Sequence, residues 1–270
     1  MSLTGRPEFI SRLEHFASVD STQRIVREWL DAGVPEVAIA RADHQQRGRG
    51  RHGRDWQAPA GAGLLVSIGF RPRALAAGHG WRLAAVVSLA MLDAAEEAAG
   101  LKDGTLWLKW PNDIVANGPD GQLLKLAGVL GESVTVGDRT DSAVIGIGLN
   151  SDWPAADFPP DLAAGMTSLH ELAGGRPISN GVLFDAFLAR LEPRYEALRG
   201  GTFDAAGWSI RQRTTGAWVE IETGGRQISG RATGVEPERG GLLVRLDGGR
   251  QELVDSGEVM RCRIAGEDRR

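Results

Sequence analysis

Residues 48–56 carry the residue types best suited to binding anions. They read Gly-Arg-Gly-Arg-His-Gly-Arg-Asp-Trp, with three glycines, three arginines and a final tryptophan. Glycine lets backbone N–H groups approach an anion, and arginine offers a planar, permanently charged fork for phosphate or carboxylate. The tryptophan adds a flat face for a base. The pattern predicts a loop that binds a nucleotide together with a second anionic group.

Other interpretations of this loop have to be weighed. The glycines match G-x-G-x-x-G, but a dinucleotide-binding turn must open a helix after a strand. Val37–Ala40 is typical of a strand, whereas residues 57–63 read Gln-Ala-Pro-Ala-Gly-Ala-Gly and cannot continue as a helix. A Walker A loop needs a Gly-Lys pair, and each lysine of this chain follows a leucine. A basic surface loop without a ligand stays open as the simplest alternative.

Lysine is rare in this chain. Of 31 Lys plus Arg residues, only Lys102, Lys109 and Lys125 are lysine. Two of them begin dense segments, Lys-Trp-Pro-Asn-Asp-Ile at 109–114 and Lys-Leu-Ala-Gly-Val-Leu-Gly at 125–131. A chain so biased toward arginine suggests that lysine is kept where arginine will not serve. A GC-rich genome is the alternative explanation of the bias.

Composition limits the class of protein. A chain of 270 residues with 42% hydrophobic residues is large enough for one large domain and a small one. The net charge of −4 gives no general attraction to nucleic acid or membrane, so the arginine cluster is a local feature. A single cysteine, Cys262, fits a reducing compartment. With no apolar signal core in residues 1–17 and no membrane-spanning run, we expect a cytoplasmic protein.

The periodicity of apolar residues predicts the elements that position these segments. Helices are expected at 24–30, 81–99 and 183–198, and strands at 37–40, 64–68, 106–108, 114–116, 125–132 and 142–150. Ser21 and Thr22 precede the first helix, and capping is the simplest role for them taken alone. Residues 144–149 alternate glycine with aliphatic residues, as when a ligand or another chain segment lies against a strand.

The residue pattern of the sequence changes after Arg213. Five short β-like runs are separated by glycine-containing turns, and they predict a small barrel. The runs are Ala217–Thr223, Gln227–Val235, Leu242–Leu246, Gln251–Val254 and Val259–Ile264. We therefore expect domains at 1–212 and 213–265, followed by a disordered tail at 266–270.

Four segments in this order resemble the biotin protein ligases. The segments are Gly48–Trp56, Lys109–Ile114, Lys125–Leu130 and Gly146–Asn150, and with Ser21–Gln23 and the barrel the likeness extends from about residue 18 to residue 264. It implies an α+β fold: a mixed β-sheet catalytic domain flanked by helices, with a small C-terminal SH3-like β-barrel. It also implies an ATP-dependent reaction in which biotin becomes biotinyl-5′-AMP with Mg²⁺ present. The biotinyl group then passes to a lysine of a biotin carboxyl carrier domain of acetyl-CoA carboxylase or a related carboxylase.

The resemblance also assigns roles to residues. The catalytic set is Lys125, Arg49, Arg51 and Asp113. The biotin-binding set is Ser21, Thr22, Gln23, Gln45, Arg49, Gly50, Arg51, Lys125 and Gly128. The ATP-binding set is Gly48, Arg51, Arg54, Trp56, Asn112, Lys125 and Asn150, with Asn150 also expected at the metal. Lys109 is left between nucleotide contact and a structural role, and Trp56 and Trp110 are interpreted as site tryptophans in preference to core tryptophans.

The chain departs from the family pattern at three positions. Gln23 stands where the family usually has asparagine, Arg47 replaces a commonly small residue, and Asp55 replaces one that is often basic or small. Gln23 puts one contact to biotin in doubt, and Asp55 lowers the positive charge at the end of the loop. We also expect the four arginines of this region to repel one another until an anion binds.

Two other functions stay open from the sequence. A lipoate or octanoate protein ligase would share fold and chemistry, and a non-catalytic RNA- or nucleotide-binding module would use the arginine loop and the barrel. The acidic net charge disfavours the second. Since only residues 1–17 precede the first motif, we expect no helix-turn-helix domain, no DNA binding and no repressor function. The oligomeric state and the acceptor carboxylase do not follow from the sequence.

Overall fold

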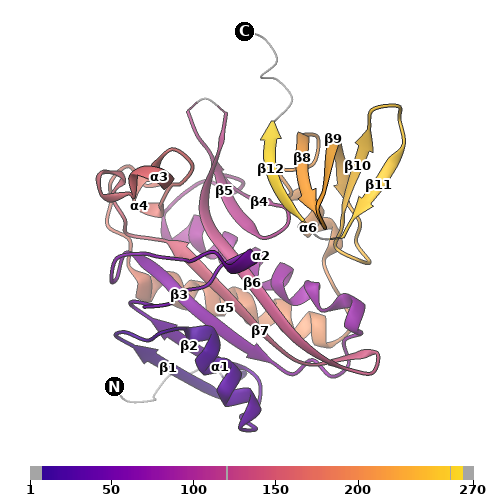
Figure 1. The fold of residues 1–270 in the computed structure, drawn as a ribbon. Coiled ribbons are helices and arrows are strands. Elements are labelled where there is room, and N and C mark those ends of the chain that lie inside the picture. Colours follow the sequence, from indigo (N-terminus) through magenta and orange to yellow (C-terminus); the bar gives the residue numbers. More distant parts are fainter. Residues whose placement is uncertain (1–7, 120, 256, 264–270) are drawn as a thin grey trace.

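The computed structural model describes residues 8–119, 121–255 and 257–263 and contains two β-sheets (Figure 1). The first sheet has seven strands: β1 (Arg12–Phe16), β2 (Ala38–Ala42), β3 (Gly63–Phe70), β4 (Leu106–Lys109), β5 (Asp113–Asn117), β6 (Leu123–Val136) and β7 (Arg139–Asn150). The helices are α1 (Thr22–Asp31), α2 (Trp81–Ala98), α3 (Pro160–Ala163), α4 (Leu169–Leu172), α5 (Asn180–Arg199) and α6 (Ala205–Ile210), with short 3₁₀ turns at Arg51–Gly53, Ala77–His79 and Ala155–Asp157. The expected helices and strands are all present.

The large sheet is mixed, as predicted. Its order is β1-β2-β3-β7-β6-β5-β4, with β1 parallel to β2 and every other neighbouring pair antiparallel. Sequence analysis did not predict β1. Its residues, Arg-Leu-Glu-His-Phe, include three polar side chains and are mostly half-buried, so the strand lacks the apolar run of the central strands. Its existence depends on pairing with β2 at the sheet edge.

Helices cover both faces of this sheet. In β2, Ala38 and Ala40 pack with α1 residues such as Val26, whereas Ile39 belongs to the main core with α2 and α5. This division follows from the strand geometry, since successive side chains point to opposite faces. Figure 1 shows α1 in front of the sheet and α2 and α5 behind it. The part of the front face beside α1 is therefore open and can form a cavity.

The start of α1 corrects the capping interpretation. Ser21 occupies the N-cap position, but its side chain makes no capping hydrogen bond. The first helical N–H, that of Thr22, donates instead to Gln45 Oε1 at 2.8 Å. The free donor at the helix start is thus satisfied by a distant glutamine, so the hydroxyl groups of Ser21 and Thr22 do not cap the helix.

The C-terminal segment forms the second, antiparallel sheet. Its strands are β8 (Trp218–Thr223), β9 (Arg226–Val235), β10 (Leu242–Leu246), β11 (Gln251–Val254) and β12 (Glu258–Arg263). In the described part of the chain their order runs β11-β10-β9-β8-β12, so the five predicted strands are confirmed as a sheet while closure into a barrel stays a prediction. The tail expected at 266–270 lies outside the described residues.

The two sheets contact each other through tryptophans. Trp110 Nε1 donates to Gly240 O at 3.0 Å, and Trp81 Nε1 donates to Glu238 O at 3.2 Å. Trp110 is 3% exposed and packs in the main core, and it also lines the cavity beside α1, so its burial does not exclude the site role inferred from the sequence. This packing fixes the segment that precedes Asn112 and Asp113. No helix in the described part of the chain is both long and apolar enough to cross a membrane.

Candidate active site

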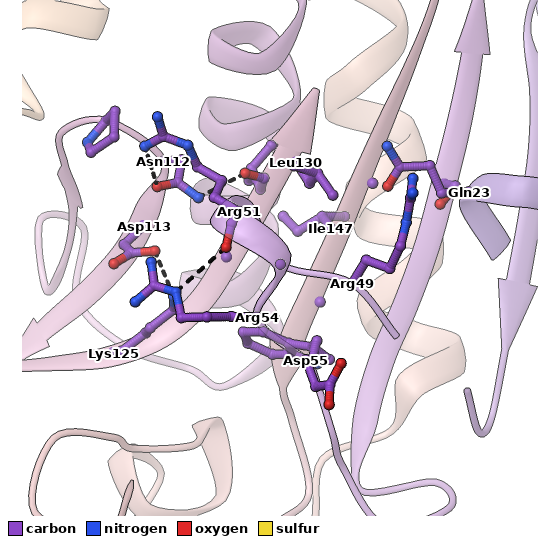
Figure 2. Close-up of a pocket in the computed structure, with 18 of the residues that line it drawn as sticks. Gln23, Arg49, Arg51, Arg54, Asp55, Asn112, Asp113, Lys125, Leu130 and Ile147 are labelled. Atoms are coloured by element: carbon purple, nitrogen blue, oxygen red, sulfur yellow. Dashed lines mark hydrogen bonds and ion pairs between the residues drawn. The ribbon is translucent and has the colours of Figure 1, made fainter. Parts of the chain in front are cut away.

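One cavity of about 340 Å³ gathers nearly all of the predicted site residues. It opens on the face of the large sheet beside α1, and Figure 2 shows Gln23 and Arg49 on one side and Arg51, Asn112, Asp113 and Lys125 on the other. The predicted residues that line it are Ser21, Thr22, Gln23, Gln45, Arg49, Gly50, Arg51, Arg54, Trp56, Asn112, Asp113, Lys125 and Gly128. Gly48 and Asn150 do not line it. The size is within the usual range for small-molecule sites.

The end of the cavity beside α1 is neutral and polar. Thr22 Oγ1 donates to Gln45 Oε1 at 3.0 Å and lies 2.8 Å from Ser67 Oγ, which then serves as the donor to Thr22. Thr22 and Ser67 are 2% and 1% exposed. Since each group fixes the next, this network is already ordered without a ligand. We name Ser21, Thr22, Gln23, Gln45 and Ser67 the polar end of the cavity.

Gln23 has an unsatisfied donor at this polar end. Its side chain is 5% exposed, and its Nε2 has no hydrogen-bond partner among the described residues. Its Oε1 lies against β7, where a β-carbon at Gly146 would be only 2.7 Å away. A buried donor without a partner is costly, so this amide is suited to a ligand that accepts a hydrogen bond.

The opposite end of the cavity is charged. Lys125 on β6 pairs with Asp113 on the neighbouring strand β5, with 2.7 Å between Nζ and Oδ1. The same Nζ lies 5.6 Å from the centre of the Trp56 ring. Lys109 also lines the cavity at this end. We name Arg51, Arg54, Lys109, Asp113 and Lys125 the charged end, and Arg49 adds a cation on the side of Gln23.

Trp56 lies across two glycines of the sheet floor. A β-carbon at Gly148 would be 2.5 Å from Trp56 Cε2, and one at Gly128 would be 3.2 Å from Cζ3. Trp56 Nε1 is buried and has no partner among the described residues. The ring therefore fits only because β6 and β7 carry glycine beneath it. Its predicted contact with adenine stays a prediction.

Each of the loop arginines Arg49, Arg51 and Arg54 contacts protein acceptors, so these side chains do not depend on a bound anion for a partner. Arg49 pairs with Glu132, and Arg54 Nη1 lies 2.6 Å from Glu258 Oε1. Arg51 instead donates to neutral oxygens, Gly257 O at 3.1 Å and Asn112 Oδ1 at 3.4 Å. Burial lowers the pKa of Arg51 from its ordinary value, and the charges of Asp113 and Glu258 oppose that shift. Arg51 remains protonated near neutral pH and makes no ion pair within the described residues.

Gly48 and Asn150 make contacts within the protein beside the cavity, and their predicted ligand roles stay predictions. A β-carbon at position 48 would collide with the carbonyl oxygen of Trp56, so Gly48 serves the loop backbone. Asn150 is 4% exposed, and its Nδ2 donates to Thr167 O at 2.9 Å. Thr167 N in turn donates to Lys125 O at 2.9 Å. Asn150 thus supports the segment beside Lys125, and the geometry lends no support to its predicted metal contact.

The family of the chain follows from comparison with known proteins. Residues 15–150 match the model of the biotin/lipoate A/B protein ligase family. The chain belongs to this family. Residues 216–261 match the biotin protein ligase C terminal domain, which accounts for the second sheet. The two matches together indicate the biotin protein ligases within this family.

Individual biotin protein ligases are similar over most of the chain. The biotin–[acetyl-CoA-carboxylase] ligase of Mycobacterium tuberculosis is 34% identical over 257 residues, covering 93% of this chain and 90% of that protein. The bifunctional ligase/repressor BirA of Bacillus subtilis is 32% identical, covering 88% of this chain and 70% of that protein. A solved biotin protein ligase of Aquifex aeolicus, in complex with biotin and ATP, has a TM-score of 0.76 at 26% identity and covers 92% of this chain and 97% of that one.

Several residues that line this cavity or pair with its arginines were not predicted from the sequence. Ser67 and Glu132 lie in strands read only as apolar runs, and Glu258 belongs to the second sheet. Gly146 and Gly148 had a signal, because glycines that alternate with aliphatic residues indicate close approach to a strand. The structure confirms that interpretation, with Gln23 above Gly146 and Trp56 above Gly148.

Proposed function

We propose that the protein activates biotin with ATP and transfers it to a lysine of a biotin carboxyl carrier domain of acetyl-CoA carboxylase or a related carboxylase. The observation that carries the proposal is the single cavity that joins a neutral polar end, with an unsatisfied buried donor, to an end rich in cations. Such a cavity fits a ligand with a polar head and a carboxylate tail that must meet a polyphosphate.

The polar end favours biotin over lipoate or octanoate. The ureido ring of biotin presents a carbonyl acceptor and two N–H donors, which match the amides and hydroxyls of Thr22, Gln23 and Gln45. A dithiolane ring or an alkyl chain offers no such partner. Sites built to hydrogen-bond a ligand reject analogues that lack the polar group, because their own buried groups are left unpaired. The unsatisfied Gln23 Nε2 makes this penalty large.

The charged end suits formation of an acyl-adenylate. In the first step, a carboxylate oxygen of biotin attacks the α-phosphorus of ATP, a P–O bond forms, and pyrophosphate leaves. Both reactants are negative, so the approach needs cations in a site with little water. Lys125 and Arg51 would bridge carboxylate and α-phosphate, Arg49 and Gly50 would enclose the carboxyl end, and Arg54 would contact phosphate. Asp113 holds Lys125 in place through their ion pair.

In the second step the acceptor lysine amine attacks the biotinyl carbonyl, a C–N bond forms, and AMP leaves. Water must be kept from the mixed anhydride until then. We infer that the loop from Gly48 to Trp56 covers the adenylate, with Trp56 against the adenine and Asn112 orienting the nucleotide. Asn150 would act on the nucleotide through the segment that carries Thr167 and contacts Lys125.

Mg²⁺ would enter with the nucleotide. No cluster of three or more His, Cys, Asp or Glu residues suited to a metal exists in the part of the chain that the structure describes. That fits Mg²⁺ better than a caged metal, because Mg²⁺ keeps several waters and uses substrate phosphates plus one or two carboxylates. Asn112 and Asp113 line the cavity near Lys125 and would offer oxygen ligands to such an ion. The ion would neutralise the charge that develops on pyrophosphate.

Isotope exchange between pyrophosphate and ATP tests this proposal. Biotin, lipoate and octanoate are supplied in parallel with magnesium ATP, and exchange is expected with biotin alone. Transfer is then followed with a biotin carboxyl carrier domain and with the same domain carrying Arg in place of its acceptor lysine. Exchange with lipoate or octanoate but not biotin would overturn the assignment.

We also propose a domain boundary between residues 212 and 213 and closure of the second sheet into an SH3-like barrel. We further propose that the protein is cytoplasmic and does not bind DNA. The separate family matches at 15–150 and 216–261 support the division. The net charge of −4 supports the last point, because it provides no general attraction to DNA. A gel shift with duplex DNA at physiological salt checks it, and a sequence-specific complex at nanomolar protein would contradict it.

A further inference from the structure

Three cations of the cavity each face a carboxylate of the protein itself. Lys125 pairs with Asp113 and Arg49 with Glu132, and these carboxylates belong to the large sheet. Arg54 pairs with Glu258, the first residue of β12 in the second sheet. Glu258 lines the cavity together with Arg51 and Arg54. The second sheet thus places one negative charge at the position where the proposed function needs a phosphate.

The position of Glu258 is fixed by its neighbours. It pairs with Glu222 of β8 in the strand register, and the next residue, Val259, is 6% exposed. At the preceding residue, a β-carbon on Gly257 would lie 2.9 Å from Glu222 O, so the backbone is seated directly against β8. The Gly257 carbonyl also accepts the hydrogen bond from Arg51. The carboxylate is therefore held beside the loop by the sheet.

We propose that Glu258 is an internal counter-ion that competes with the phosphates of ATP for Arg54 and thereby sets the affinity of the site for the nucleotide. The proposal rests on the proposed function, in which Arg54 contacts phosphate. A guanidinium binds carboxylate and phosphate through the same planar fork. The Arg54 N–H groups that bind Glu258 therefore cannot bind the nucleotide at the same time. Glu258 is a positioning residue in this scheme.

The ion pair is weak enough to be exchanged. The Arg54 and Glu258 side chains are 60% and 32% exposed, and pairs of this kind contribute little because water competes for both groups. A triphosphate with bound Mg²⁺ presents more charge and more acceptors than one carboxylate. It would therefore displace Glu258 at a modest cost in affinity. Without the carboxylate that cost disappears.

A role for Glu258 in helping to bind ATP predicts the opposite change in ATP affinity when the carboxylate is removed. If the carboxylate instead held Mg²⁺ or oriented the nucleotide, its removal would weaken ATP binding. The test is Glu258→Gln, assayed by pyrophosphate exchange and by titration of tryptophan fluorescence with magnesium ATP. The KM and Kd for ATP are expected to fall about two- to fivefold, with the KM for biotin unchanged. Glu258→Asp, which keeps the charge, should stay closer to the wild type.

A double-mutant cycle isolates the proposed competition. Arg54→Ala should raise the KM for ATP, and Glu258→Gln should have no further effect in that background, because the contested group is gone. The control is Glu252→Gln on β11, whose carboxylate pairs with Arg226 and Arg250 and does not line the cavity. A higher KM for ATP in Glu258→Gln, or a persistent effect in the Arg54→Ala background, would overturn the proposal.

The two assays separate this proposal from the proposed function. Wild-type protein that binds ATP but shows no biotin-dependent exchange would contradict the function alone, and the fluorescence titration would still test Glu258. Exchange with biotin together with equal Kd values for wild type and Glu258→Gln would contradict the counter-ion alone. Absence of ATP binding in the wild type would overturn both.

Discussion

The two ends of the cavity are built differently. The polar end comes from the start of α1, the segment after β2 and strand β3, and all its side chains except the half-buried Gln45 are almost fully buried. Thr22 joins Gln45 and Ser67 in one hydrogen-bond network. The charged end uses a loop, three strands of the large sheet and the second sheet, and several of its side chains are exposed. At the polar end, Gln23 Nε2 has no hydrogen-bond partner among the described residues. Two cations of the charged end, and Arg49 beside them, pair with carboxylates that a polyphosphate would replace.

This difference indicates a division of work. Buried neutral groups with fixed partners discriminate between ligands, because an analogue that cannot pair with them leaves polar atoms unsatisfied. Cations held by exchangeable ion pairs stabilise charge that appears only during the reaction. Substitutions at the polar end should therefore change which acid is used, and substitutions at the charged end should change nucleotide affinity and rate.

The largest effect is expected at Lys125. Lys125→Ala should lower the rate of pyrophosphate exchange about 10²–10³-fold, by analogy with the loss of one oxyanion donor. Lys125→Arg should also be poor, since a planar fork does not replace a compact ammonium group between Asp113 and Trp56. Lys102→Ala, at an exposed lysine outside the cavity, is the matched control. Wild-type rates for both Lys125 variants would remove this residue from the chemistry.

Gln23 should have the next largest effect. Gln23→Leu keeps the approximate side-chain size but removes the amide, so the KM for biotin should rise about tenfold or more through lost hydrogen bonds. The KM for ATP should change little, and the ratio of kcat/KM for biotin to that for octanoate should fall. The control is Gln46→Leu, because Gln46 is exposed and lies outside the cavity. An unchanged preference for biotin would contradict the role given to the polar end.

Two glycines of β7 test the division within a single strand. At Gly146 a new methyl group would displace Gln23, and at Gly148 it would displace Trp56. Gly146→Ala should raise the KM for biotin and Gly148→Ala the KM for ATP, each by about tenfold, as expected for overpacking. Circular dichroism melts check that both variants fold. Equal effects of both variants on both substrates would show that the two ends are not independent.

The smallest effect is expected in the accessibility of the loop. Arg47, Arg49 and Arg54 are exposed and held by surface ion pairs, so trypsin should cut after them in the free protein. Biotin with magnesium ATP should slow these cuts several-fold, because the adenylate would order the loop. Cleavage after Arg226, in the second sheet, is the internal reference. Equal cleavage with and without ligands would contradict closure of the loop over the adenylate.

Much of the site could be predicted because its residues are adjacent in the sequence. The segments at 48–56, 109–114 and 125–131 each bring charged residues together with glycine, proline or asparagine, and the structure places all three around one cavity. Asn150 shows the limit of this reasoning. It follows Gly146 and Gly148 at a spacing of two and so belongs to the same face of β7. At the strand end, however, the segment carrying Thr167 covers it and uses its amide.

The sequence by itself determined the local chemistry: the order of the central strands and the three longest helices, the turns that require glycine, and the cations available to an anion. Tertiary structure decided the partners of those cations, because Glu132 and Glu258 lie 83 and 204 residues from Arg49 and Arg54. It also decided that Trp110 packs in the core while it lines the cavity, that β1 forms at all, and that Gln23 Nε2 has no hydrogen-bond partner among the described residues. The physical reason is that pairing, burial and desolvation depend on the neighbours that folding brings together, which no local pattern specifies.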